Sequence, residues 1–194
     1  MSYHPKKQQQ HKENVEKAME NAQEERGQIL VITGNGKGKT TAGFGNITRA
    51  LGHLQKVAVV QFVKGVGECG ERNLLESLGV PFHTMATGFS WNSEDKAKDK
   101  LAAEQAWQQA KQWLQDPTLD MVLLDELTYM ITWDFLELND ILNALKQRPK
   151  EMSVIITGRA AHRELKELAD TVSEVRPEKH AFHQGLMARK GLDW

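Results

Sequence analysis

The sequence has little cysteine, no long apolar run and no excess of charge of either sign. Its single cysteine, Cys69, excludes an internal disulfide and suits a reducing cytosol. No apolar stretch approaches the length of a membrane span, and the polar N-terminal segment shows no secretory signal, so we expect a cytoplasmic protein without a membrane partner. A formal net charge of -1 does not favour a nucleic-acid partner, and 194 residues suit one well-packed domain.

Several functional motifs are also missing from the sequence. The guanine-reading motif Asn-Lys-x-Asp does not occur, which disfavours a GTPase. The lysine typical of partition-type ATPases would fall at Gly34, so that class is disfavoured as well. His180 and His183 lie three residues apart, but no third ligand accompanies them, so we interpret them as solvated or structural histidines.

The sequence does contain a strand, a glycine loop and a helix in direct succession. Apolar residues 29–32 predict a buried strand, and the pattern from Thr40 to Leu51 predicts a helix. Glycines between them let backbone N–H groups turn toward an anion at the start of that helix. Lys39 would reach phosphate oxygens and the Thr40 hydroxyl would bind Mg²⁺. The glycine loop, residues 34–41, consists of Gly34, Asn35, Gly36, Lys37, Gly38, Lys39, Thr40 and Thr41.

This loop departs from the phosphate-binding pattern G-x-x-x-x-G-K-[ST] at one position. Thr33 stands where the pattern has its first glycine, and Gly34 and Gly36 lie within the loop instead. The second lysine, Lys37, indicates a ligand with more negative charge than a diphosphate. A glycine-rich turn with solvated lysines is the alternative interpretation, but the agreement of strand, loop and helix disfavours it.

Further strands and helices alternate along the chain. The pattern predicts strands at 57–62, 80–85, 121–124, 154–157 and 171–175, and helices at 71–78, 138–145 and 162–169. A long helix should begin after Asn92 or Ser93 and end before Pro117. Several strands are apolar on both faces, so we expect an α/β, P-loop (RecA-like) domain with a largely parallel sheet flanked by helices, over residues 27–194. Residues 1–26 predict a polar arm, helical from about 13 to 26, that is either a frayed tail or a lid over a ligand.

Polar side chains follow the strands at their carboxyl ends, where ligands bind in parallel sheets. Gln61 lies at the end of the second predicted strand and Lys64 follows it, and Asp125 and Glu126 follow the fourth strand. Residues 123–126 have the form of a Walker B strand, whose acid holds Mg²⁺ directly or through water. Arg159 is placed to meet a polyphosphate. A solvated carboxylate pair and an ordinary surface arginine are the alternatives.

Five segments together resemble the ATP:corrinoid adenosyltransferases of the CobA/BtuR type. They are residues 33–41, 60–65, 85–91, 124–129 and 156–159, and the resemblance runs from about residue 26 to residue 194. It implies transfer of the 5′-deoxyadenosyl group of ATP to the Co(I) centre of a corrinoid (cobalamin, cobinamide or cobyrinic acid diamide), with release of triphosphate. By the same resemblance, this reaction would serve the biosynthesis or the salvage of adenosylcobalamin. The pattern of the residues alone indicates only an Mg²⁺-nucleotide α/β domain.

The resemblance also implies roles for particular residues. Lys39, Lys37 and Arg159 would stabilise the charge that develops on the leaving triphosphate. Because Co(I) is itself the nucleophile, no general base is required. By resemblance, Mg²⁺, or Mn²⁺ in its place, would be held by Thr40 and Glu126, with Asp125 as a further candidate.

Phe89 and Trp91 match the family segment thought to displace the lower ligand of cobalt, although aromatic side chains in a loop also often close a core. The resemblance further implies a flavodoxin-type electron donor and a homodimer. A different class of protein is the runner-up, namely a P-loop regulatory or binding protein that hydrolyses ATP to ADP and switches a partner through the arm.

Overall fold

The computed structural model describes residues 5–63, 68–85 and 96–194, and side chains from residue 9 onward within those ranges. Three residues singled out from the sequence, Lys64, Phe89 and Trp91, lie outside the described residues. The predicted caps Asn92 and Ser93 lie outside them too.

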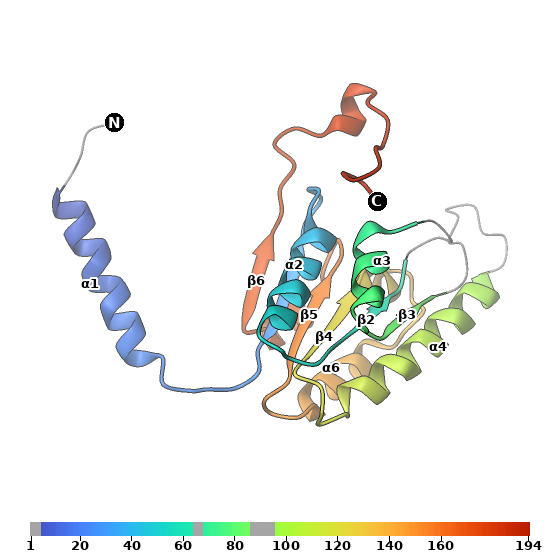
Figure 1. Ribbon diagram of the computed structural model, residues 1–194, viewed down its shortest axis with the longest axis horizontal. Helices are drawn as coiled ribbons and strands as arrows, with labels where there is room; N and C mark the ends of the chain where they lie inside the picture. Colours follow the sequence, from blue (N-terminus) through green and yellow to red (C-terminus); the bar gives the residue numbers. More distant parts are fainter. Residues whose placement is uncertain (1–4, 64–67, 86–95) are drawn as a thin grey trace.

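A six-stranded sheet forms the centre of the molecule (Figure 1). Its strand order is β3-β2-β4-β5-β1-β6, and every pairing is parallel. The carboxyl ends of all six strands therefore lie at one edge, which confirms the α/β class. The strands are β1 (Ile29–Thr33), β2 (Val57–Gln61), β3 (Phe82–Thr84), β4 (Met121–Asp125), β5 (Ser153–Thr157) and β6 (Thr171–Glu174).

Helices cover both faces of the sheet. One face packs against α2 (Lys39–Gly52) and α3 (Gly70–Ser77), and the other packs against α4 (Lys96–Leu114), α5 (Leu127–Thr132), α6 (Leu138–Gln147) and α7 (Arg163–Leu168). Strand β4 illustrates why a strand in this position is almost entirely apolar. Leu123 belongs to the α2 side of the core, whereas Val122 and Leu124 belong to the α4 side. Such strands must be apolar on both faces.

Gly43 lets the helix that follows the glycine loop approach the sheet closely. A Cβ atom at this position would lie 3.0 Å from Leu123 Cδ1 and 3.1 Å from Thr157 Cγ2. The first turns of α2 therefore rest directly on the carboxyl ends of β4 and β5, and this contact sets the height of the glycine loop above the sheet.

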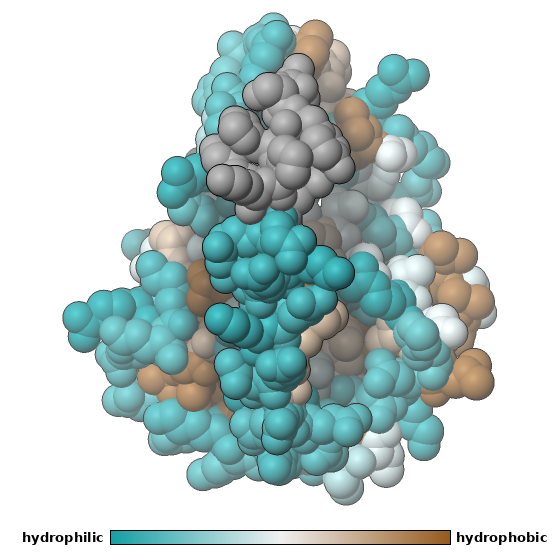
Figure 2. Space-filling model, turned by 90° about the vertical axis from the view of Figure 1, so that its left-hand side faces the viewer, coloured by the Kyte–Doolittle hydropathy of each residue, from teal (hydrophilic) through white to brown (hydrophobic). Residues whose placement is uncertain are grey.

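The N-terminal arm is helical, but its helix lies earlier in the chain than predicted. Helix α1 spans Pro5–Asn21 and stands apart from the sheet (Figure 1), so the expectation of a helix from about 13 to 26 was wrong at both ends. Residues 24–26 are drawn out of a helix because Arg26 binds the carboxylate of Asp170 across the molecule. Seen from the side of α1, the surface is predominantly hydrophilic (Figure 2), and Met19 is 72% exposed.

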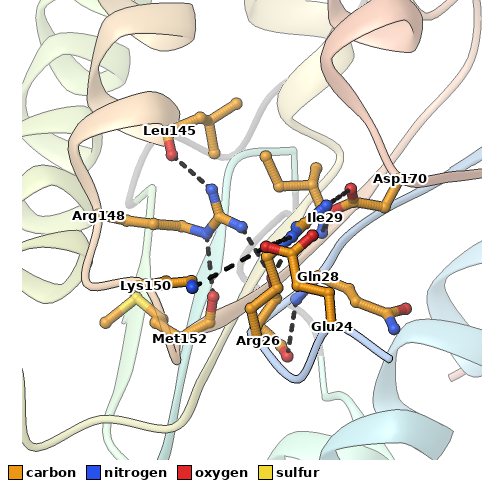
Figure 3. A network of polar contacts seen from close by, with 11 residues as sticks. Glu24, Arg26, Gln28, Ile29, Leu145, Arg148, Lys150, Met152 and Asp170 are labelled. Carbon is orange, nitrogen blue, oxygen red and sulfur yellow. Dashed lines mark hydrogen bonds and ion pairs between the residues drawn. The ribbon is translucent and has the colours of Figure 1, made fainter. Parts of the chain in front are cut away.

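The root of the arm is fixed by a network of polar contacts (Figure 3). Arg26 Nη1 donates to Asp170 Oδ2 at 3.0 Å, and the same oxygen accepts from the backbone N–H of Ile29 at 2.8 Å. These donors, the Arg26 side chain first, lower the pKa of Asp170 to about 2. Arg148 Nη2 donates to the carbonyl of Gly27 at 3.2 Å. The arm therefore leaves the domain from one defined point beside β1.

The core includes Trp107, which is 2% exposed, and the single cysteine, Cys69, is buried. Helix α5 and the short 3-10 helix Ala181–Gln184 were missed, because each is too brief for a helical period to show. Within the described ranges, none of the helices is long and apolar enough to cross a membrane.

Candidate functional site

An open cavity of about 1040 Å³ lies above the glycine loop at the carboxyl edge of the sheet. Its lining comes from four parts of the chain: the loop and the start of α2, helix α3, the ends of β4 and β5, and the C-terminal segment. The lining residues are 36–42, Gly70, Glu71, Leu74, Glu126, Arg159, His180 and 191–194. The cavity therefore brings together the loop, the Walker B acid and the arginine that the sequence pointed to.

The glycine loop is fastened to the segment that follows β6. Gly36 N–H donates to the carbonyl of Val175 at 2.7 Å, and Val175 N–H donates to the carbonyl of Thr33 at 2.8 Å. A Cβ at Gly36 would lie 2.8 Å from Val175, so this residue has no room for a side chain. Gly38 has a φ of 112° and precedes α2 in the left-handed region that glycine adopts most readily.

Lys39 is 7% exposed, and its ammonium group lies in the bend of the loop. Its Nζ donates to the carbonyl of Gly36 at 2.8 Å. Burial lowers the pKa of Lys39, and the nearby carboxylate of Glu126 partly offsets this effect. An ammonium group has three donors, so Lys39 can keep the loop contact and still donate to an anion in the cavity.

The second loop lysine has a different environment. Lys37 is exposed, and its Nζ donates to Asp193 Oδ1 at 2.7 Å. Asp193 belongs to the last residues of the chain, which form part of the cavity lining. The sequence indicated no period and no motif for residues 178–194, so it gave no signal that this segment meets the loop.

A hydrogen-bonded chain of buried groups links the ends of β2, β4 and β5. Asp125 is fully buried, and its two carboxylate oxygens accept from Gln61 Nε2 at 3.1 Å and from Thr157 Oγ1 at 2.7 Å. The Thr157 hydroxyl in turn accepts from the backbone N–H of Glu126 at 2.9 Å. Neither Asp125 nor Gln61 lines the cavity. Among the described residues, Gln61 Oε1 is buried without a hydrogen-bond partner.

Glu126 sits directly after β4 in an unusual backbone conformation. Its φ of 60° and ψ of 24° place it in the left-handed region, which costs a non-glycine residue about 1 kcal/mol or more. The bond from Glu126 N–H to Thr157 helps to hold this conformation. A Cβ at Gly158 would lie 2.0 Å from Thr128 Oγ1 and 3.2 Å from Glu126 Oε2, so the glycine leaves room for the glutamate side chain.

Most of the residues predicted from the sequence fall around one cavity. Six of the eight loop residues line it, together with Glu126 and Arg159. Gly34 and Asn35 belong to the loop but lie off the cavity wall, and Gly34 packs against Val175. The sequence analysis predicted helix α3, but it did not foresee that α3 and the C-terminal segment line the cavity. Among the described residues, no group of three or more His, Cys, Asp or Glu side chains forms a metal-binding cluster of protein ligands alone.

A parallel sheet with helices on both faces and a lysine-bearing glycine loop at its carboxyl edge defines an α/β protein, a class whose ligands bind beyond the carboxyl ends of the strands. Comparison with known proteins narrows this class. The model of the family described as "ATP:corrinoid adenosyltransferase BtuR/CobO/CobP" matches residues 25–194. The chain belongs to this family, whose members are transferases.

Named relatives agree with this assignment over nearly the whole chain. A corrinoid adenosyltransferase of Escherichia coli (strain K12) is 56% identical over 188 residues, covering 97% of this chain and 96% of that protein. The corrinoid adenosyltransferase CobA of Salmonella typhimurium is 54% identical over the same coverage, and a corrinoid adenosyltransferase of Pseudomonas aeruginosa is 41% identical over 100% of both chains. Domain III of the Thermotoga maritima replication initiation protein DnaA covers 90% of this chain and 64% of its own at a TM-score of 0.39 and 12% identity, which is too distant to support an argument.

Proposed function

We propose that this protein transfers the 5′-deoxyadenosyl group of ATP to the Co(I) centre of a reduced corrinoid and releases triphosphate. The electron pair of Co(I) forms the Co–C5′ bond, the C5′–O bond breaks, and the oxygen leaves with the triphosphate. The observation that supports this most directly is the convergence of Lys37, Lys39, Arg159 and Glu126 on one cavity in a member of the adenosyltransferase family.

The charges around the cavity suit a triphosphate leaving group. Negative charge grows on the α-phosphate as the C5′–O bond breaks, and a fixed ammonium group lowers the energy of that state. Lys39 is buried and anchored by the loop, so it needs little rearrangement to do so. We assign Arg159 and Lys37 to the remaining phosphate charge. The backbone N–H groups of residues 37–41, Thr41 among them, complete the phosphate contacts. Gly34, Asn35 and Gly36 shape the loop instead, since Gly34 and Asn35 lie off the cavity wall and the Gly36 N–H is engaged by Val175.

Mg²⁺, or Mn²⁺ in its place, fits this donor set. Thr40 and Glu126 both line the cavity and offer a hydroxyl and a carboxylate, which are hard oxygen ligands. Asp125 has both carboxylate oxygens engaged by protein donors, so we propose that it supports Glu126 through Thr157 rather than binding the ion directly. The bound ion would neutralise part of the phosphate charge.

Gln61 is fully buried and lies off the wall of the cavity in this structure, and by the resemblance we propose that it becomes a hydrogen-bond acceptor for ATP when the nucleotide binds. Its Nε2 is committed to Asp125, which fixes the orientation of the amide and turns Oε1 away from the carboxylate. A ribose hydroxyl or the adenine amino group would suit such an acceptor. Lys64, Phe89 and Trp91, which lie outside the described residues, are proposed to contact the substrates on the grounds of the resemblance alone.

The reductant, the assembly and the location are further parts of the proposal. Formation of Co(I) from Co(II) needs one electron, and a flavodoxin-type protein would supply it. We also propose a homodimer in the cytoplasm. Size-exclusion chromatography with light scattering tests the dimer, since a monomeric mass at micromolar concentration would contradict it.

One incubation tests the proposed reaction. The protein is mixed with ATP, Mg²⁺ and chemically reduced cobalamin, and the corrinoid spectrum and the phosphate products are followed. We expect light-sensitive adenosylcobalamin and triphosphate in equal amounts. ADP and phosphate without a cobalt–carbon product would contradict the proposal and favour the nucleotide-switched regulator, which family membership disfavours.

A further inference from the structure

The last residues of the chain form a compact turn with its own hydrogen bonds, here called the 189–194 turn. Asp193 N–H donates to the carbonyl of Arg189 at 2.8 Å, and Gly191 N–H donates to the carbonyl of Trp194 at 2.9 Å. Asp193 Oδ2 accepts from Arg189 N–H at 2.8 Å. Since these bonds lie within the turn, it can change position as a unit without losing them.

Within the part of the chain that the structure describes, two ion pairs hold the 189–194 turn against the rest of the molecule. Asp193 binds Lys37 of the glycine loop at 2.7 Å, with the two side chains 28% and 45% exposed. Lys190 binds Glu68, just before α3, at 3.1 Å, with side chains 77% and 67% exposed. The turn lies above α3 in Figure 1, and residues 191–194 line the cavity beside the loop. The inner pair thus places a carboxylate on a lysine of the glycine loop.

We propose that Asp193 is an intramolecular competitor for polyphosphate at Lys37, and that binding of polyphosphate releases the 189–194 turn from the glycine loop. This inference rests on the proposed function, because it takes the loop as the polyphosphate site. A carboxylate beside the cavity repels an incoming phosphate chain, and both anions seek the same ammonium group. Hydrogen bonding from Lys37 lowers the pKa of Asp193, so the carboxylate is ionised at neutral pH.

The size of the effect follows from the exposure of the pair. Solvent weakens a partly exposed ion pair, so removing the competing charge should tighten polyphosphate binding by no more than roughly two- to fivefold. Asp193→Asn is the suitable change because asparagine keeps an acceptor oxygen for Arg189 N–H and preserves the turn. Glu68→Gln is its matched control, since it removes one acid and one ion pair of the same turn without touching Lys37.

Binding of inorganic triphosphate, measured by calorimetry with the full chain, is the first test. Triphosphate alone is the probe, so the result does not depend on transferase activity. We expect Asp193→Asn to bind two- to fivefold more tightly than the wild type, and Glu68→Gln to bind as the wild type does. Equal or weaker binding by a folded Asp193→Asn variant, checked by circular dichroism, would overturn the proposal.

Limited trypsin digestion supplies the second test. Arg189 and Lys190 are tryptic sites within the turn, and mass spectrometry detects the loss of residues 190–194 or 191–194. Triphosphate should accelerate this loss from the wild type and leave the Asp193→Asn rate nearly unchanged, because that turn is already released. Protection by triphosphate would overturn the inference. If the wild type binds no triphosphate at all, both this inference and the proposed function are wrong. If the wild type binds triphosphate and Asp193→Asn changes nothing, only the inference is wrong.

Discussion

Thr157→Val tests whether the buried chain from Asp125 to Glu126 holds the site together. Valine has nearly the same shape as threonine but lacks the hydroxyl, which donates to Asp125 at 2.7 Å and accepts from Glu126 N–H at 2.9 Å. The variant leaves a buried N–H without an acceptor and removes one donor from a fully buried carboxylate. Each loss costs about 1 to 3 kcal/mol, and because the two share one hydroxyl we expect about 3 kcal/mol in total.

Thr157→Ser is the matched control for this prediction. Serine keeps the hydroxyl but loses the methyl group that packs near Gly43, which should cost about 1 kcal/mol. Urea unfolding separates the two variants: with a slope of about 2 kcal/mol per molar, Thr157→Val should unfold at about 1 to 2 M lower urea than the wild type. The valine variant should also lose roughly ten- to a hundredfold in kcat, because Glu126 is no longer held in place. Unfolding of Thr157→Val at the wild-type midpoint, or of both variants at the same midpoint, would refute the reasoning.

Four further predictions follow from the site and the arm. Lys39→Ala should abolish transfer and weaken ATP binding, and near-normal kcat/KM would mean that the site is misplaced. Deletion of residues 1–26 should raise the corrinoid KM and leave ATP binding nearly intact if the arm is a lid, and unchanged constants for both substrates would make it a frayed tail. Phe89→Ala or Trp91→Ala should slow the reaction when Co(II) must be reduced on the enzyme, and slow it much less when Co(I) is supplied. The signal of four-coordinate Co(II) in electron paramagnetic resonance should be smaller in both variants. An unchanged signal in folded protein would make the two aromatic residues part of the core. Asp170→Asn should lower stability by about 1 kcal/mol at pH 6, because the aspartate stabilises the fold only while ionised. The difference from the wild type should shrink as the pH falls from about 4 toward the folded-state pKa of about 2, and a difference of undiminished size at pH 2 would contradict this.

The sequence was informative wherever one local pattern decides the structure. The strands with runs of apolar residues are buried on both faces as predicted, and the helix after the glycine loop begins at Lys39, one residue from its expected start. The Asp125–Glu126 pair was found for the same reason, since it ends such a strand. The local pattern could not distinguish the roles of the two acids. Only the tertiary structure shows that the Asp125 side chain is bound by Thr157 and Gln61.

The features that sequence reasoning missed depend on distant partners. The arm helix ends at Asn21, before its predicted end, because Arg26 binds Asp170, which is 144 residues away in the sequence. Nothing in residues 178–194 is periodic, yet Asp193 meets Lys37. Contacts of this kind are determined by the tertiary structure, and they produce no periodic pattern in the sequence around either residue.

The bonds between the glycine loop and Val175 have a consequence for how the protein is made. The loop lies near the start of the chain, but its Gly36 N–H and the carbonyl of Thr33 find their partners only in the segment after β6. During synthesis the first strand and the loop leave the ribosome long before Val175 does. Contacts so far apart in sequence form late, because most of the chain must be ordered to bring them together. A ribosome-bound chain that stops short of Val175 should therefore lack a competent phosphate site, so the loop cannot bind ATP until the segment after β6 has been made.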